Sequence, residues 1–207
     1  MEKKSVALTF DDGHSNITSE VLDILEANEA KGTFFLIGDN ISDASPELIK
    51  RQLKLGCEIG NHSLTHSNMT ELSAEDIKAE IEETSSRIEK LIGSRPKFFR
   101  PPYLVQNDVM FDNIDMPFIH GADSKDWDEN VSVEERINNV MDLVKDGAII
   151  LMHDFTDNRR TLEALPIIIS KLRDDNYEFV TVSEIFERKG VNPNVQHKCW
   201  TYVCDNK

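Results

Sequence analysis

The chain has 207 residues, of which 39% are hydrophobic and 29% are charged, a composition typical of one globular domain. Its formal net charge of −15 argues against nucleic acid or a membrane surface as a partner, because phosphate groups attract clusters of Lys and Arg. No apolar run approaches the roughly 18 residues that cross a bilayer. Because Met1-Glu2-Lys3-Lys4 leads at once into a predicted strand, we do not expect the apolar segment of a signal peptide in this chain.

Short apolar runs rich in Val, Ile and Phe alternate along the chain with longer amphipathic stretches, a pattern typical of βα units. Strands are predicted at residues 5–10, 32–37, 57–60, 97–99, 117–120, 148–152 and 178–181. Helices are predicted at residues 16–28, 46–55, 73–92, 133–145 and 161–174. Because no repeat or low-complexity linker divides this series, we predict a single α/β domain built on a parallel, barrel-like sheet.

Capping residues mark the ends of several predicted helices. Ser45 precedes Pro46, and we expect them to be the N-cap and the first helical position of the second helix. Ser73 and Gly93 should begin and end the third and clearest helix, and Ser132 should cap the fourth.

The last part of the chain has no clear hydrophobic period. We therefore expect a catalytic domain at residues 1–190 and a tail packed on its surface at residues 191–207. Three cysteines are a poor disulfide framework: Cys57 has an apolar context and is expected to be a buried thiol, while a bridge between Cys199 and Cys204 stays open.

Polar side chains follow five of the predicted strands, at the point where each strand ends. They are Asp11 and Asp12, His62 and His66, residues 100–103, residues 123–127, and His153. In a parallel α/β sheet the carboxyl ends of the strands form the active-site edge. We therefore expect these groups to converge on one functional site.

Two histidines and two aspartates in this set suit a metal ion. His62 and His66 stand four residues apart, which in a helical turn brings both rings within reach of one ion. Asp11 and Asp12 end an apolar strand, where adjacent carboxylates are costly unless paired or metal-bound. One would bind the ion and the other would take a proton from its water, although an acidic turn closed by Gly13 is the alternative.

The segment Arg100-Pro101-Pro102-Tyr103 offers two further functions. Arg100 is a candidate to keep the base ionised and oriented. The two prolines fix the backbone and hold the Tyr103 amide in one direction, as a hydrogen-bond donor to a transition state requires. A rigid loop with a solvent-directed arginine is the alternative.

His153 ends a very apolar strand and is the candidate general acid. Asp126, beside Trp127, would hold its far ring nitrogen and raise its pKa. A buried structural histidine is the alternative. The remaining histidines have no comparable setting and are expected to be structural: His14, His120 and His197.

Together and in this order, these segments resemble the polysaccharide deacetylase family, the fourth family of carbohydrate esterases, which includes chitin and peptidoglycan deacetylases and acetylxylan esterases. The matching segments are residues 9–13, 62–66, 100–103, 123–127 and 151–154. The resemblance covers about residues 5–187. It implies a distorted (β/α) barrel with about seven strands, and a metal-dependent hydrolase that removes acetyl groups from a polysaccharide or oligosaccharide.

The resemblance also implies a metal-binding set and a general base. Asp12, His62 and His66 would bind a divalent ion, commonly Zn²⁺, with Co²⁺ or Ni²⁺ as alternatives. Asp11 would be the base, oriented by Arg100.

Proton donation and acetyl binding are implied in the same way. His153 would protonate the leaving group, braced by Asp126. The Tyr103 amide and the ion would stabilise the oxyanion, while Trp127 and Leu151 would line the pocket for the acetyl methyl group.

Two positions depart from the family pattern. Members usually carry proline where this chain has His14, and often glycine where it has Leu104. Neither is a predicted ligand or proton carrier, so the predicted chemistry is unaffected. Both are expected on the rim of the site, where they bear on the shape of the sugar groove.

The identity of the acetylated group stays open at this point. The leaving group would be an amine in N-acetylglucosamine units of chitin oligomers or peptidoglycan, or an alcohol in acetylated xylan, and N-deacetylation is slightly favoured as the commoner family activity. A carbohydrate-binding pseudoenzyme is disfavoured because no ligand, base or acid is missing. A hydrolase of small amides is disfavoured because the ligand motifs are intact.

The resemblance bears on the setting of the protein as well. We expect a monomer whose partner is its acetylated carbohydrate substrate. Its expected location is extracellular or in the cell envelope, with the signal segment absent from this chain, and a cytoplasmic location stays open.

Overall fold

A nearly all-buried strand, β1 (Lys4–Asp11), runs through the centre of the sheet. The structure is a computed structural model that describes residues 3–204. One edge of β1 pairs with β6 (Ala148–His153). The other edge pairs first with β7 (Tyr177–Phe179) and then with β2 (Gly32–Leu36), and all of these pairings are parallel.

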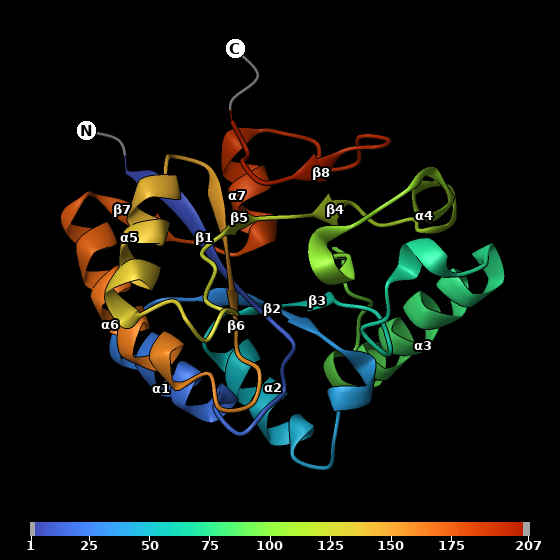
Figure 1. Cartoon of the computed structure of the whole chain (residues 1–207), viewed down its shortest axis with the longest axis horizontal. Coiled ribbons are helices and arrows are strands. Elements are labelled where there is room, and N and C mark those ends of the chain that lie inside the picture. Colours follow the sequence, from blue (N-terminus) through green and yellow to red (C-terminus); the bar gives the residue numbers. More distant parts are fainter. Residues whose placement is uncertain (1–2, 205–207) are drawn as a thin grey trace.

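The sheet continues on both sides of β1 and curves into a distorted barrel (Figure 1). β2 pairs with β3 (Glu58–Asn61), and Phe99 bridges β3 to β4 (Phe118–Ile119). On the other side, β6 pairs with β5 (Ala122–Asp123). A short last strand, β8 (Cys199–Trp200), pairs with β4.

Helices cover the outside of this barrel. They are α1 (Thr18–Ala27), α2 (Ser45–Lys54), α3 (Ala74–Ile92), α4 (Asp108–Asn113), α5 (Val133–Leu143), α6 (Arg159–Asp174) and α7 (Val182–Lys189), with single 3-10 turns η1 (Gly38–Asn40), η2 (Met69–Glu71) and η3 (Pro102–Leu104). Neighbouring helices touch in the order α5, α6, α1, α2, α3 and α4. Within residues 3–204, none of them is both long and apolar enough to cross a membrane.

Alternation along β1 separates the core from the site. Val6 and Leu8 pack into the cluster between the sheet and the helices, whereas Ala7 belongs to a second cluster on the opposite face, packed against α7. Because side chains alternate along a strand, Asp11 shares the face of Ala7. It therefore ends the strand with its carboxylate inside the barrel.

The α/β fold with a parallel, barrel-like sheet is confirmed by this topology. The strand predicted at residues 97–99 contributes only the bridge at Phe99. β5 and β8, each two residues long, were not predicted, and α4 and α7 were also missed. The caps at Ser73 and Ser132 are confirmed, and Gly93 ends α3 in the left-handed conformation.

The predicted cap of the second helix is wrong. Ala44 occupies the N-cap of α2, and no side chain caps it. Ser45 lies inside the helix, where its hydroxyl accepts from the Ser42 amide and bonds the His14 ring. The hydroxyl that the sequence assigns to capping is therefore used to attach the first loop to α2.

The segment predicted as a surface tail is integrated into the barrel as far as the structure describes it. Its backbone joins two strands: the His120 amide donates to the Trp200 carbonyl at 2.8 Å, and the Ile149 amide donates to the Thr201 carbonyl at 3.1 Å. Trp200 is buried in the second core cluster. Residues 205–207 lie outside the described residues, and the catalytic-domain boundary at residue 190 stays a prediction. The three cysteines are free thiols, so the bridge left open between two of them is absent.

Candidate functional site

The carboxyl ends of the strands surround a pocket of about 350 Å³. Strand register brings distant residues together there, since Asp11 in β1 lies beside His153 in β6. The pocket is lined by Asp11, Asp12, His62, His66, Pro101, Tyr103, Leu104, Asp123, Trp127, Leu151 and His153. The predicted convergence of polar groups from separate strand ends is therefore observed.

Three of these side chains are arranged to hold a cation. Ligand atoms of Asp12, His62 and His66 lie within 4.8 Å of one another. The Oδ1 atom of Asp12 is 3.4 Å from Nε2 of each histidine, and ligands in a tetrahedral zinc site at about 2.1 Å from the ion stand about 3.4 Å apart. This Oδ1 atom is buried without a hydrogen-bond partner. The donor set thus fits a divalent ion, and such an ion would satisfy the buried oxygen.

Hydrogen bonds orient the first histidine for this role. The Nδ1 atom of His62 lies 2.7 Å from the carbonyl oxygen of Arg100, which makes Nδ1 the donor and leaves the Nε2 lone pair directed at Asp12. Burial opposes protonation, but the charges of Asp11 and Asp12 raise the pKa of His62. Burial also opposes ionisation of Asp12, yet electrostatic attraction to His62 lowers the pKa of Asp12 to about 2.

A loop, and not the predicted helical turn, brings the two histidines together. Ser63 and His66 both have positive φ angles, of 64° and 58°. The Ser63 hydroxyl accepts from the His66 amide, and the Glu80 carboxylate accepts from the Leu64 and Thr65 amides. Asp12 is also left-handed, with φ of 73°. Such conformations cost about 1–3 kcal/mol each and persist where surrounding contacts enforce them, commonly at functional sites.

Asp11 forms a buried ion pair beside the cation set. Its Oδ1 atom lies 2.6 Å from Nη1 of Arg100, whose side chain is fully buried. Arg100 also donates to the Thr9 hydroxyl at 2.8 Å and to the Ile119 carbonyl at 3.3 Å, and lies over the Phe35 ring. The arginine is thus fixed inside the barrel, and the predicted solvent-directed alternative is wrong.

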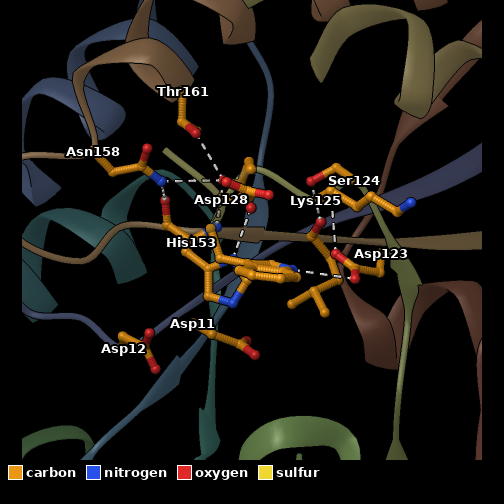
Figure 2. A network of polar contacts seen from close by, with 12 residues as sticks. Asp11, Asp12, Asp123, Ser124, Lys125, Asp128, His153, Asn158 and Thr161 are labelled. Atoms are coloured by element: carbon orange, nitrogen blue, oxygen red, sulfur yellow. Dashed lines mark hydrogen bonds and ion pairs between the residues drawn. The ribbon is translucent and has the colours of Figure 1, made fainter. Parts of the chain in front are cut away.

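His153 faces the pocket beside Asp11 and is held by a carboxylate network (Figure 2). Its Nδ1 atom lies 2.7 Å from Oδ1 of Asp126, and its backbone amide donates to Oδ2 at 2.9 Å. The Thr161 hydroxyl and the Asn158 amide donate to the same Oδ2 atom. Burial alone would lower the pKa of His153, but the Asp126 charge raises it to about 9.

Aromatic and apolar side chains form the walls of the pocket. Tyr103 and Trp127 are 65% and 54% exposed, whereas Leu151 lies buried at the base. The Tyr103 ring packs edge-on against His66, with centroids 4.7 Å apart. The Trp127 indole N–H donates to Asp123 at 3.2 Å, so its ring is held although it is exposed (Figure 2).

Two residues that depart from the family pattern have different surroundings. His14 is buried and bonds Ser45 and Gln52 through its two ring nitrogens, so it packs against α2. It does not line the pocket, which corrects the expectation that it shapes the rim. Leu104 does line the pocket, as expected.

Several supporting residues had no signal in the sequence. Asn158 and Thr161 reach Asp126 from 32 and 35 residues away, and nothing in their local pattern distinguishes them from a helix start. Asp154 lies beneath the first loop, and a Cβ at Gly13 would stand only 2.6 Å from its carboxylate. Burial, with the charges of Asp12 and Asp11, raises the pKa of Asp154 to about 7.

A family model described as polysaccharide deacetylase matches residues 1–115. A bifunctional xylanase/deacetylase from Pseudobutyrivibrio xylanivorans is 50% identical over 201 residues, covering 97% of this chain and 33% of that protein. The peptidoglycan-N-acetylglucosamine deacetylase PgdA of Listeria monocytogenes is 35% identical over 189 residues, covering 90% of this chain and 40% of that protein. The chain thus spans well under half the length of these curated relatives.

Solved structures give a similar result over the whole chain. The Xyl-CE4 domain of a multidomain xylanase from the hindgut metagenome of Trinervitermes trinervoides is 51% identical with a TM-score of 0.96, covering 98% of both chains. A family 4 acetyl xylan esterase from Clostridium thermocellum, solved with a cobalt ion, is 41% identical with a TM-score of 0.92, covering 97% of this chain and 99% of that one.

Proposed function

Because this chain belongs to the polysaccharide deacetylase family, we propose that it is a metal-dependent hydrolase that removes acetyl groups from a polysaccharide. One observation carries the proposal: the cation-binding set shares one pocket with Asp11 and His153, and each of these two is paired with a buried side chain, Arg100 and Asp126 respectively. Hydrolysis of an acetyl group needs one group that accepts a proton from water and another that donates one to the leaving atom. The two pairs meet these needs.

The cofactor is a divalent ion, and Zn²⁺ is our preferred candidate, with Co²⁺ and Ni²⁺ as alternatives. Its ligands are Asp12, His62 and His66, whose donor atoms and spacing suit tetrahedral binding with one position left open. Once bound, the ion supplies Lewis acidity, polarising the acetyl carbonyl and lowering the pKa of a water molecule. The cobalt ion bound by the related esterase supports a divalent metal as the cofactor.

Asp11 is the general base in this proposal. Its Oδ1 atom is held by Arg100 at 2.6 Å, which leaves Oδ2 as the oxygen that accepts the proton of the attacking water. The ion pair with the guanidinium fixes the carboxylate in direction. The Tyr103 backbone amide is proposed to donate to the oxyanion that develops on the acetyl oxygen.

His153 is the general acid. Its Nδ1 atom is engaged by Asp126, so Nε2 carries the proton that passes to the leaving oxygen or nitrogen. A pKa raised to about 9 keeps this ring protonated near neutral pH. Leu151 and Trp127 enclose the acetyl methyl group at the base and side of the pocket.

Acetylated xylan is the proposed substrate. Two relatives near 50% identity are a xylanase/deacetylase and a domain of a xylanase, and the whole chain aligns with both. N-deacetylation of chitin oligomers or peptidoglycan, slightly favoured above as the commoner family activity, becomes the second candidate. The similarity to PgdA, at 35% identity, supports it less strongly.

The proposed cellular location and oligomeric state follow from the substrate and the site. A polymeric substrate favours an extracellular or cell-envelope location. A monomer suffices, because all residues of the proposed site come from one chain.

Acetate release tests this proposal directly. Purified protein, supplied with Zn²⁺ or Co²⁺, would be assayed in parallel on acetylated xylan, chitin oligomers and peptidoglycan. We expect the fastest release from xylan and none after chelation of the metal. Activity on none of the three, with metal bound, would overturn the proposal.

A further inference from the structure

Two exposed aromatic side chains stand at the pocket. Tyr103 and Trp127 are 65% and 54% exposed, and both line it. Leu104 lines the pocket next to Tyr103 in the chain. An apolar rim beside a polar site offers contact to the apolar face of a ligand and few hydrogen bonds.

Leu104 has a backbone conformation that disfavours its own side chain. Its φ is 56°, directly after Tyr103 at 57°. In this left-handed region a Cβ crowds the following carbonyl, which glycine avoids and leucine does not. The turn itself is fixed by the backbone, because the Leu104 amide donates to the Pro101 carbonyl at 3.1 Å. Glycine would therefore serve this turn at lower conformational cost.

Packing within the fold does not explain the leucine. The side chain is partly exposed, and it belongs to none of the apolar clusters of the described residues. It faces the pocket instead. The side chain is therefore placed to contact a bound ligand and not the protein's own core.

We propose that Leu104 determines substrate specificity by contacting the sugar ring beside the acetyl group and favouring a pyranose whose C5 carries no substituent. Xylose has a bare CH₂ at this position, which a branched apolar side chain can cover. N-acetylglucosamine carries a hydroxymethyl group there, which would be pressed against Leu104 and lose hydrogen bonds to water without gaining others. This inference rests on the proposed deacetylase function.

The test compares three substitutions at this position. Leu104→Gly removes the side chain and the conformational cost of the positive φ angle. Leu104→Asn introduces a polar side chain that tolerates the left-handed conformation, and Leu104→Met keeps an apolar side chain. Glu29→Gly is the matched control, since Glu29 is exposed, lies outside the pocket and has φ of 46°.

We expect Leu104→Gly and Leu104→Asn to lower kcat/KM on acetylated xylo-oligosaccharides about tenfold or more. Their preference for these over chitin oligomers should fall by a similar factor, while kcat on a small aryl acetate stays within about twofold. Leu104→Met should keep most of the preference. Glu29→Gly should match Leu104→Gly in thermal stability and leave every rate unchanged.

Two results with Leu104→Gly would overturn the inference and leave the proposed function intact: an unchanged preference between the two substrates, or an equal loss of activity on the small acetate. A wild-type protein that prefers chitin oligomers would also overturn it while leaving the deacetylase intact. A wild-type protein without activity on any acetylated carbohydrate would overturn the proposed function and this inference together.

Discussion

The Nη1 atom of Arg100 lies 2.6 Å from Oδ1 of Asp11, and both side chains are buried inside the barrel. The pair joins the end of β1 to the segment after Phe99, which are 89 residues apart in the chain. It therefore contributes to closing the barrel as well as to orienting the proposed base.

Removing the arginine should be costly for the fold. In Arg100→Met the Asp11 carboxylate loses its partner in a buried site, and we expect the free energy of unfolding to fall by about 3–5 kcal/mol. Urea denaturation measures this loss. The double variant Arg100→Met with Asp11→Asn should recover part of it, because no buried charge is then left unpaired. Equal stability of the two variants would contradict this view of the pair.

The ligand set predicts a clear division among metal-binding variants. His62→Ala or His66→Ala should lose the ion, since each removes one of three ligand atoms. Metal content after dialysis, measured by mass spectrometry, checks this. His120→Ala is the matched control, because His120 bonds Gln106 and does not line the pocket. Retention of a full equivalent of metal by both ligand variants would contradict the assignment.

The Asp126–His153 pair predicts an alkaline limit to activity. His153 has a pKa raised to about 9, so its protonated form, and with it kcat, should decline as the pH rises through that value. Asp126→Asn should move the decline toward the ordinary histidine pKa near 6.5, which a pH profile of kcat would measure. An identical pH profile in the variant would show that His153 is not the general acid.

The same pair makes stability depend on pH, with a definite sign. The folded-state pKa of His153 lies above its unfolded value, so the stabilisation is fully present below about pH 6.5 and is lost as the pH rises to about 9. Thermal melts across this range should show a smaller decline in Asp126→Asn than in the wild type.

The bond between Asp123 and Trp127 predicts an effect on polymer binding. Asp123 accepts from the indole N–H at 3.2 Å and from the Lys125 amide at 2.8 Å, so Asp123→Asn should release the ring and keep the turn. We expect KM for acetylated xylan to rise severalfold with little change in kcat. Trp127→Phe should raise KM similarly, and the double variant should add nothing further. Additive effects would show that the carboxylate acts independently of the ring.

Much of the site could be predicted because its residues stand at the carboxyl ends of strands. Asp11, Asp12, His62 and His153 each follow an apolar run that is long enough to identify as a strand, and parallel strands place their carboxyl ends together. The caps at Ser73 and Ser132 were equally local and were predicted correctly.

Tertiary contacts explain what the sequence did not reveal. β5 and β8 have two residues each, too few to show an alternating pattern. They form strands because their backbones pair with β6 and β4. Ser45 has the local pattern of a cap, but His14, 31 residues away, engages its hydroxyl. Trp200 lies in a segment without periodicity. It is buried because this segment pairs with the backbone at residues 120 and 149, between β4 and β6.

The assignment of Asp11 as the general base is tested most directly by measuring the activity of Asp11→Asn on protein whose metal content is known. We expect this variant to keep its bound ion, since Asp11 is not a proposed ligand, and kcat to fall by about 10²–10⁴-fold because no carboxylate accepts the proton from water. Near wild-type turnover with the ion bound would contradict the assignment of Asp11 as the base.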